Sequence, residues 1–565
     1  MIVINCKNNS DLNRVYHLMK AFFPNQEIKQ QINTEQEPQL EFILDDGSCF
    51  TVLPDEVSED EEKETLIKKV YDVLSEYTNK TLPWGILTGV RPTKLAMKAI
   101  MEGTREVKNK NCEVDVGDRE ESIIPREDRE GQRSPEEIER VLCDKYYLSP
   151  KKAKLAVQVA KREKELLASL DLENGFSLYV SIPFCPSICS YCSFGSGELE
   201  KWQNKVDEYL GRLCDEITAV GDIIDERIER KGEEERKGLG GIKSDEKKAL
   251  RKLNTIYIGG GTPTTLSVEQ LRKLFNTIKK TFSLDNLIEY TVEAGRPETI
   301  TSEKLRLFKE VGITRISINP QSMNQQTLDR VGRNHKVSDI VEAFKLARQE
   351  GFDNINMDLI IGLPGEGVSE VIATLEQIKE LEPDSLTIHT LAMKRGSEAS
   401  NEYKEKVEAE KRGREKIDYK EEVVNNKENT NQFEDDVNQL KAKQTEDHYT
   451  EEIDQEDNIN EMLNLCYDAA KEMSLMPYYL YRQKNIAGNF ENVGFAKVDK
   501  AGIYNILIIE ELQTIIGVGV GATTKIVTRE KKKVKEDENE AQQNEEYSLT
   551  IRRHANTKDI GKYLA

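Results

Sequence analysis

Short apolar runs alternate with amphipathic segments through the middle of the chain. Runs rich in β-branched and aromatic residues predict six strands, at 177–184, 254–261, 288–295, 314–322, 354–364 and 384–392. Apolar residues at helical spacing predict helices between most of these strands, at 267–282, 302–312, 338–351 and 369–382. Repeated strand–helix units are typical of a parallel sheet. Because there are six units, the sequence predicts an α/β fold with a partial (β/α)6 barrel, since a closed barrel of this kind needs eight.

The same spacing predicts helices before the barrel, at 64–77, 136–147 and 149–170. We therefore expect an N-terminal α+β region at 1–170, the partial barrel at 171–400 and a C-terminal extension at 461–565.

Charge runs interrupt this pattern. Residues 401–460 hold 19 acidic and 10 basic residues and few apolar ones. Such a stretch buries too little apolar surface to fold alone, so we expect a charged, low-complexity insertion. Residues 104–136 are expected to form a smaller acidic insertion, and the runs at 224–250 and 529–547 have a similar composition.

Polar and glycine-rich clusters follow the predicted strands. Three cysteines come after the first strand and "GGGTPT" (259–264) after the second, while Glu293 ends the third, Gln321 the fourth and Asp358 lies at the end of the fifth. In a parallel barrel these ends meet on one face, where active sites form. We therefore expect one shared site.

The net charge of −22 narrows the classes of partner. It argues against binding to nucleic acid or to an anionic membrane surface. No apolar stretch approaches the roughly 18 residues that a membrane span needs, and the first residues, "MIVINCKNNS", lack the pattern of a signal peptide. The cysteines outside the cluster have no pairing pattern, which favours a reducing, cytoplasmic location. These are Cys6, Cys49, Cys112, Cys143, Cys214 and Cys466.

Cys185, Cys189 and Cys192 have C-x3-C-x2-C spacing. A structural zinc site needs four ligands, and the rest of the chain has no matching C-x2-C or H-x3-H pair, although His335 or His389 could supply a fourth ligand. A redox C-x-x-C of Cys189 and Cys192 would leave Cys185 unexplained. Three thiolates on one tight loop fit an iron–sulfur cubane with one iron open to a further ligand. The spacing favours the cluster, with the zinc and dithiol alternatives still open.

Several segments resemble a known family. "YVSIPFCPSICSYC", "GGGTPT", "INPQS", "VGRNH" and "MDLIIGLP" are similar to motifs of radical S-adenosylmethionine enzymes, and more narrowly of oxygen-independent coproporphyrinogen III oxidases, over roughly residues 175–395. The flanks, at 83–103 and 478–495, resemble the branch called HemZ, or coproporphyrinogen dehydrogenase.

The resemblance implies a set of ligands. Cys185, Cys189 and Cys192 would hold a [4Fe–4S] cluster, and S-adenosylmethionine would bind its fourth iron. Contacts to this cofactor would come from Tyr179, Gly260, Gly261, Thr262 and Glu293. Contacts to a second S-adenosylmethionine would come from Tyr191, Gln321, Arg333, Asp358 and Ala392.

The resemblance also implies a reaction. A 5′-deoxyadenosyl radical would take hydrogen from the β-carbon of a propionate, and loss of carbon dioxide and an electron would leave a vinyl group. Coproporphyrinogen III would thereby become protoporphyrinogen IX, in haem biosynthesis. The implied partners are the porphyrinogen and a low-potential electron donor of flavodoxin or ferredoxin type. The C-terminal extension would lie on the substrate side.

Two positions depart from the best-studied members. They carry a histidine where this chain has Ser181 and a fourth cysteine where it has Phe194. A related branch, the haem-binding chaperones, shares the barrel and the cysteine spacing, and it is the alternative function. Its C-terminal His-Asn…Tyr-Trp segment has no counterpart here, because the two tryptophans are Trp84 and Trp202.

A substrate with four carboxylates needs cations in its pocket. The candidates are basic residues in apolar-flanked segments, whose alternative role is an ordinary turn or surface patch. They are Arg91, Lys94, Lys394, Arg395, Arg482 and Lys484.

Overall fold

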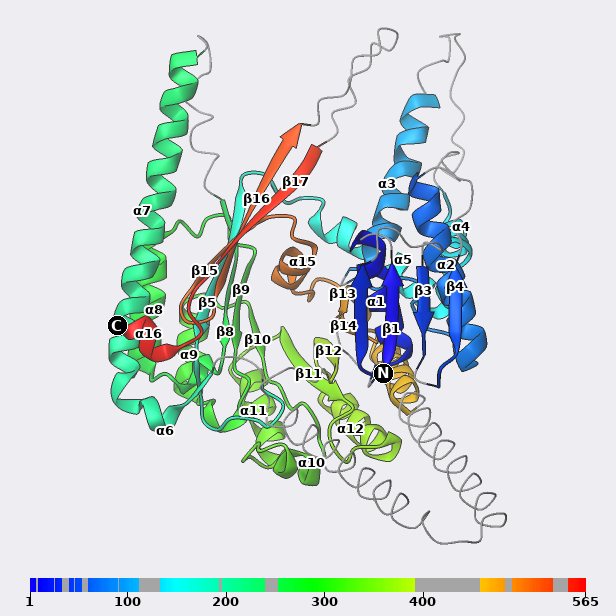
Figure 1. The fold of residues 1–565 in the computed structure, drawn as a ribbon. Coiled ribbons are helices and arrows are strands. Elements are labelled where there is room, and N and C mark those ends of the chain that lie inside the picture. The colour runs from blue at the N-terminus through cyan, green and yellow to red at the C-terminus, as the bar shows by residue number, and fades with distance from the viewer. Residues whose placement is uncertain are drawn as a thin grey trace, which may run out of the picture.

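The computed structural model describes residues 1–6, 9–24, 26–32, 40–44, 46–52, 59–89, 91–110, 133–192, 196–238, 252–391, 458–482, 490–531 and 547–565. At its centre lies an eleven-stranded sheet (Figure 1). Its strand order is β13-β14-β12-β11-β10-β9-β8-β5-β15-β16-β17.

The six predicted barrel strands are confirmed. They are β5 (Gly175–Ile182), β8 (Lys252–Gly260), β9 (Glu289–Glu293), β10 (Arg315–Ser317), β11 (Ile355–Ile361) and β12 (Ser385–Thr390). Consecutive strands pair in parallel, in chain order. Their carboxyl ends therefore lie on one side of the sheet, as a shared site requires.

Helices between these strands cover the sheet. They are α7 (Val206–Gly238), α8 (Val268–Thr281), α9 (Ser302–Glu310), α10 (Gln325–Arg330), α11 (Val337–Gln349) and α12 (Val368–Leu381). Helix α8 shows how the sequence produces them. Ser267 and Gln270 form a capping box at its start, and Leu271, Leu274 and Ile278 are buried at helical spacing.

The C-terminal extension completes both edges of the sheet. Strands β13 (Met476–Arg482) and β14 (Glu491–Ala496) continue beyond β12 with antiparallel pairing. On the other edge, β15 (Thr514–Val518) pairs in parallel with β5, and β16 (Thr523–Lys531) and β17 (Tyr547–Ala555) form a projecting ribbon (Figure 1). Helix α15 (Ile503–Glu510) follows β14 in the chain and precedes β15. The strand pattern of the sequence indicated none of these five strands.

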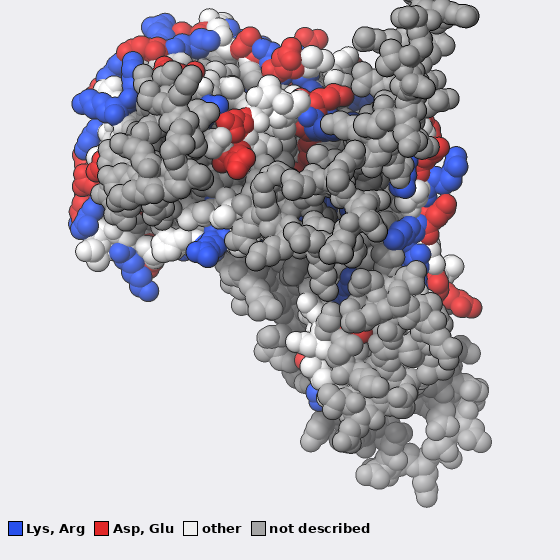
Figure 2. Space-filling view, turned by 90° about the horizontal axis from the view of Figure 1, so that it is seen from above, with Lys and Arg blue, Asp and Glu red and all other residues white. Residues whose placement is uncertain are grey.

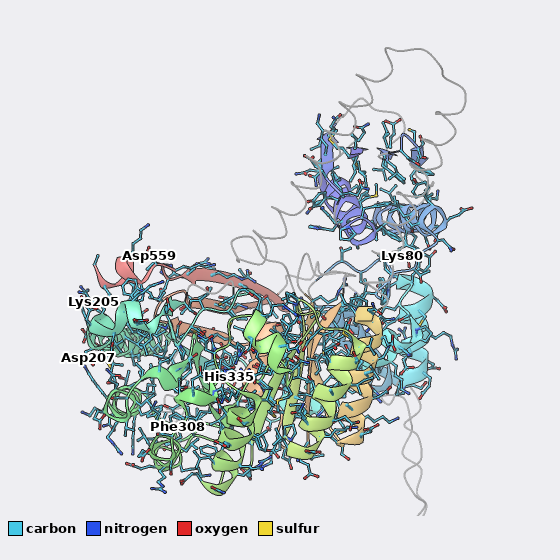
Figure 3. All side chains as sticks on the ribbon, turned by 90° about the horizontal axis from the view of Figure 1, so that it is seen from below. Lys80, Lys205, Asp207, Phe308, His335 and Asp559 are labelled. Carbon is cyan, nitrogen blue, oxygen red and sulfur yellow. The ribbon has the colours of Figure 1, made fainter. Side chains whose placement is uncertain are left out.

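The N-terminal region builds a core of its own. Strands β1 (Ile2–Cys6), β2 (Ile28–Ile32), β3 (Leu40–Ile43) and β4 (Cys49–Val52) form a second sheet with the order β2-β1-β3-β4. Helices α1 (Asn9–Phe22) and α2 (Glu59–Thr78) pack with it. Figure 3 shows this unit beside the central sheet, with Lys80 near the junction.

Three more helices connect this unit to the central sheet. They are α3 (Thr93–Lys110), α4 (Pro135–Tyr146) and α5 (Pro150–Leu167). The predicted helices at 64–77, 136–147 and 149–170 are thus confirmed, by α2, α4 and α5.

Much of the predicted charged sequence lies outside the described residues, namely 111–132, 239–251, 392–457 and 532–546. The described helix α7 covers the first part of the run at 224–250. On the described part of the face in Figure 2, basic and acidic side chains are interspersed. Of the described helices, none has the length and apolar character of a membrane span.

Candidate functional site

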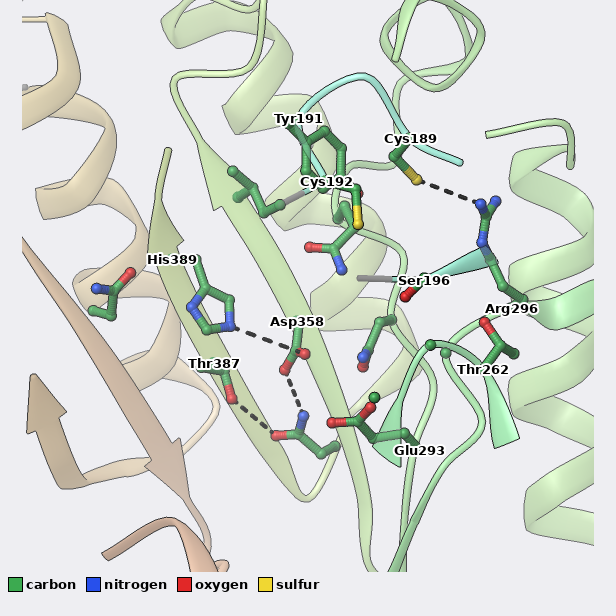
Figure 4. A pocket seen from close by; sticks show the side chains of 18 of the residues that line it. Cys189, Tyr191, Cys192, Ser196, Thr262, Glu293, Arg296, Asp358, Thr387 and His389 are labelled. Atoms are coloured by element: carbon green, nitrogen blue, oxygen red, sulfur yellow. Dashed lines mark hydrogen bonds and ion pairs between the residues drawn. The ribbon is translucent and has the colours of Figure 1, made fainter. Parts of the chain in front are cut away.

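One pocket of about 510 Å³ opens at the carboxyl ends of the barrel strands (Figure 4). Twelve of the thirteen predicted site residues line it: Tyr179, Cys185, Cys189, Tyr191, Cys192, Gly260, Gly261, Thr262, Glu293, Gln321, Arg333 and Asp358. The thirteenth, Ala392, lies outside the described residues, as does Phe194. The expectation of one shared site is therefore met for every predicted residue that the structure describes.

The glycines of "GGGTPT" hold the cysteine segment in place. The Gly261 amide donates to the Ile182 carbonyl and the Thr262 amide to the Phe184 carbonyl, both at 2.7 Å. A Cβ on Gly261 would lie 2.7 Å from the Phe184 carbonyl oxygen, closer than packing allows. Glycine is therefore required at position 261 because this turn passes close to the segment that leads into Cys185.

Two thiols accept hydrogen bonds from neighbouring side chains. Thr262 Oγ1 lies 3.5 Å from Cys185 Sγ, and an Arg296 Nη2 donates to Cys189 Sγ at 3.4 Å (Figure 4). Arg296 also donates to the Ser187 carbonyl at 2.6 Å, so it fixes both the loop and its sulfur. Burial raises the pKa of Cys185.

Arg333 fastens the other side of the cysteine loop. Its guanidinium donates to the carbonyls of Gly295, at 2.8 Å, and Asn319, at 2.6 Å, and to Tyr191 Oη at 3.2 Å. The side chain is buried, so Arg333 is not an ordinary residue of the protein surface. Its Nε, which is also buried, has no hydrogen-bond partner among the described residues.

Glu293 stands among aromatic rings at the end of β9. Tyr257 Oη donates to its Oε1 at 2.5 Å, and the Tyr257 ring stacks on Tyr504 with centroids 4.6 Å apart. Burial raises the pKa of Glu293 to about 7, since the Tyr257 hydrogen bond opposes this shift only in part and the charge of Asp358 adds to it. The carboxyl therefore changes charge near neutral pH.

A backbone bridge connects Gln321 to β11, where its bridge partner is Leu359. Gln321 has a left-handed backbone with φ 68°, and its amide donates to the Asp358 carbonyl at 2.9 Å. Its buried Oε1 has no hydrogen-bond partner within the described chain. Strained backbone and unpaired polar atoms are common at ligand sites.

Asp358 also belongs to a polar row across the pocket floor (Figure 4). Asn356 Nδ2 donates to Asp358 Oδ1 at 2.7 Å, and His389 Nε2 lies 4.0 Å from its Oδ2. Tyr481 Oη lies 3.5 Å from His389 Nδ1. The Asp358 carboxylate therefore accepts a hydrogen bond from an amide side chain, that of Asn356.

The C-terminal extension supplies pocket residues that the sequence analysis missed. We call four of them the C-terminal wall: Tyr481 of β13, Asn492 of β14, and Ile508 and Ile509 of α15. The alternation of Tyr479 and Tyr481, which both line the pocket, was an available signal for a strand.

The predicted cations for the substrate are wrong where the structure describes them. Arg91, Lys94 and Arg482 are not among the lining residues. The apolar flanks of these residues predicted burial, and Arg482 is indeed buried. It is buried against another part of the chain, since its guanidinium donates to the Leu87 carbonyl. The other three, Lys394, Arg395 and Lys484, lie outside the described residues.

Three barrel arginines line the pocket instead: Arg296, Arg315 and Arg333. Arg315 is buried and donates through Nη2 to Ser385 Oγ at 3.1 Å. Its Nε has no hydrogen-bond partner in the described part of the chain.

Ser181, which stands where the best-studied members have a histidine, does not line the pocket. Its hydroxyl donates to the Val520 carbonyl at 2.7 Å.

Comparison with known proteins bears on this site. Residues 179–378 match the family model described as the radical SAM superfamily. The oxygen-independent coproporphyrinogen-III oxidase-like protein HemZ of Bacillus subtilis (strain 168) is 34% identical over 475 residues, which are 84% of this chain and 75% of that protein. The chain belongs to the oxygen-independent coproporphyrinogen-III oxidase-like family of radical SAM proteins.

This oxidase-like family has relatives with different names. Heme chaperone HemW of Bacillus subtilis (strain 168) is 34% identical over 216 residues, 38% of this chain and 50% of that protein. The coproporphyrinogen III oxidase HemN of Escherichia coli, described as a radical SAM enzyme, has a solved structure with 20% identity and a TM-score of 0.41, over 66% of this chain and 70% of that one.

Membership in the radical SAM superfamily implies S-adenosylmethionine and a [4Fe–4S] cluster, and the pocket fits both groups. A cubane takes one thiolate per iron, and three cysteines line one cavity. Gln321 Oε1 and Arg333 Nε, which have no partner in the part of the chain that the structure describes, offer an acceptor and a donor to a polar ligand. Among the described residues, no three His, Cys, Asp or Glu side chains are placed so that they could hold a single metal ion. Of the two histidines considered as a fourth zinc ligand, His335 has its Nδ1 3.2 Å from Glu298 Oε2.

Proposed function

We propose that this chain is a radical S-adenosylmethionine enzyme that decarboxylates propionate side chains of coproporphyrinogen III to vinyl groups without oxygen. The observation that supports it best is the convergence of the three cysteines, the predicted cofactor contacts and three arginines on one pocket. When bound, the cluster and S-adenosylmethionine would supply a 5′-deoxyadenosyl radical. A low-potential electron donor of flavodoxin or ferredoxin type would provide the electron.

The residues around the thiols would hold the cluster. Cys185, Cys189 and Cys192 would bind three irons, with Thr262 and Arg296 donating to two of the sulfurs. Hydrogen bonds to cluster sulfurs stabilise negative charge on them and raise the reduction potential. The proposal therefore gives Arg296 a role that the sequence analysis did not assign.

The carboxylate of Glu293 would accept a hydrogen bond from the ribose or amino group of S-adenosylmethionine. Tyr179, Gly260 and Gly261 line the same part of the pocket. Tyr191, Gln321, Arg333, Asp358 and Ala392 would contact a second S-adenosylmethionine, as the family resemblance implies.

Arg315 would bind a substrate propionate. It is a buried cation that lines the pocket, and its Nε has no hydrogen-bond partner among the described residues. A guanidinium binds a carboxylate through two parallel hydrogen bonds. His389, Tyr479 and Tyr481 would surround the remainder of the macrocycle. The local charge would thus attract the substrate even though the chain carries a net charge of −22.

The test is an anaerobic turnover with reconstituted protein, S-adenosylmethionine, a strong reductant and coproporphyrinogen III. We expect 5′-deoxyadenosine, carbon dioxide and a product with new vinyl groups. Arg315→Lys is expected to weaken turnover while leaving cleavage of S-adenosylmethionine without substrate largely unchanged. Absence of porphyrinogen consumption would refute the proposal.

A haem-binding chaperone is the second candidate, because Heme chaperone HemW is 34% identical over 38% of this chain. The match to HemZ also covers the flanks of the barrel, since it includes 84% of this chain, and this extent supports the enzyme. Stoichiometric haem binding without consumption of coproporphyrinogen III in the same experiment would favour the chaperone.

A further inference from the structure

A short N-terminal segment joins the two cores of the molecule. Leu82 and Ile86 belong to the core of the N-terminal sheet, whereas Trp84, between them, is fully buried in the core of the central sheet. Gly85 has a φ of 53°, and a Cβ there would lie 2.1 Å from the Tyr146 carbonyl oxygen. Any larger residue at this position would force the segment apart.

The first contact from this segment reaches β14. Trp84 Nε1 donates to Glu491 Oε2 at 2.7 Å, and the Glu491 carboxylate is fully buried. The next residue, Asn492, lines the pocket, and its Oδ1 accepts from the Thr390 amide at 3.0 Å. Because adjacent residues in a strand point to opposite faces, a fixed Glu491 also fixes the direction of Asn492.

The second contact reaches β13. The Leu87 carbonyl accepts a hydrogen bond of 2.5 Å from Arg482 Nη1, and the guanidinium lies over the Trp84 ring, 5.7 Å from its centroid. Arg482 ends β13 and directly follows Tyr481, which faces the pocket.

The third contact reaches the end of α15. Arg91 Nη1 donates to the Glu510 carbonyl at 2.8 Å, and Arg91 Nη2 lies 3.2 Å from Glu511. Thr93 Oγ1 donates to the Glu510 carboxylate at 3.2 Å. A cation at a helix C-terminus satisfies its last carbonyls, and here it holds the turn that carries Ile509 into the pocket.

We propose that Trp84, Leu87, Arg91 and Thr93 form an N-terminal clamp that positions the C-terminal wall and thereby sets how tightly the substrate binds. The three contacts reach Glu491, Arg482 and Glu510, each of which is next to a member of that wall. No clamp residue lines the pocket itself. They are therefore positioning residues. The inference rests on the proposed function only for the identity of the substrate.

Two substitutions test the clamp, Trp84→Phe and Arg91→Gln. The first removes the Nε1–H donor and keeps most of the ring, and the second removes the cation. Arg272→Gln is the control, because Arg272 makes an exposed pair with Glu310 between α8 and α9. Hydrogen exchange followed by mass spectrometry on the apo chain gives a readout that needs no activity.

We expect amide exchange to rise by about fivefold in peptides covering 476–482 and 491–510, as local opening becomes easier. Exchange in 175–185 is expected to be unchanged, and the control is expected to match the parent chain everywhere. Unchanged exchange in the C-terminal wall, or an equal rise in 175–185, would overturn the clamp.

Steady-state kinetics give the second readout. The KM for coproporphyrinogen III is expected to rise about tenfold, which is the effect of losing one hydrogen bond to a charged group. Cleavage of S-adenosylmethionine without substrate should stay within about twofold, because the cluster side is untouched. Equal loss of both activities would mean that the segment only holds the fold. If the parent chain consumes no coproporphyrinogen III, the proposed function fails, and hydrogen exchange still decides the clamp.

Discussion

Replacing Glu293 by glutamine tests the electrostatics of the pocket most directly. Burial raises the pKa of this carboxyl to about 7 from an ordinary value of 4.5. At about 1.4 kcal/mol for each pH unit, holding the ionised form in the pocket costs on the order of 3 kcal/mol. Glutamine has nearly the same shape and carries no charge, so the variant removes that cost.

The sign of the effect follows from proton binding. Below about pH 4.5 the carboxyl is protonated in the folded and the unfolded chain, so it has no effect on the difference in free energy. Between about pH 4.5 and 7 the folded chain keeps a proton that the unfolded chain loses, so stability falls as the pH rises. Above about pH 7 the full penalty is present.

The assay is urea unfolding of apo protein at pH 5 and pH 8. We expect Glu293→Gln to gain on the order of 2–3 kcal/mol over the parent at pH 8 and much less at pH 5. Tyr257→Phe is the matched control, because it removes the donor that lowers the pKa of Glu293. In this variant the pKa of Glu293 should rise further, so the loss of stability should extend to a higher pH than in the parent. A difference between variant and parent that is the same at both pH values would refute the reasoning.

The same carboxyl gives a binding prediction. If Glu293 accepts from S-adenosylmethionine, affinity should fall by up to about tenfold per pH unit below pH 7, since the proton must leave first. The glutamine variant should bind more weakly at pH 8 and show no such pH dependence. Isothermal titration calorimetry on reconstituted protein measures both.

Three further predictions concern the cysteines, their arginine and a buried ion pair. Cys189→Ala should abolish the brown iron–sulfur chromophore, whereas Cys49→Ser, at an exposed thiol, should retain it in absorbance spectra. Arg296→Gln should lower the midpoint potential of the cluster by on the order of tens of millivolts in an EPR-monitored titration, because a donor to Cys189 is lost; an unchanged potential would contradict this. Lys152→Met should destabilise the chain by about 3–5 kcal/mol, because it leaves Glu491 buried without its cation, whereas a loss below about 1 kcal/mol in urea unfolding would indicate a surface-like pair.

The barrel was predictable because its pattern is local. Each strand is a short apolar run with a helix after it, and several site residues stand at or just after the end of a run, such as Glu293 at the end of β9 and Cys185 after β5. A sequence read in this way places Cys185, Glu293 and Asp358 on one face without any knowledge of long-range contacts. The same reasoning found the pocket.

The edges of the sheet were not predictable in this way. Strand β15 has five residues, and its partner β5 lies more than 300 residues earlier in the chain. The role of Arg296 depends on the path of two loops, and that of Arg91 and Arg482 on the docking of one region against another. Apolar flanks indicate that such a residue is buried, but they do not show which other part of the chain packs against it.

The late position of β15 in the chain has a consequence for synthesis. The strand that leads into the cysteines has a free edge until residues 514–518 have been made. At about 5–20 residues per second, that edge waits for roughly 15–70 seconds after β5 itself is complete. Unpaired strand edges bind other strands of the same kind. The yield of correctly assembled protein should therefore depend on the speed at which the ribosome makes the more than 300 residues that separate β5 from β15.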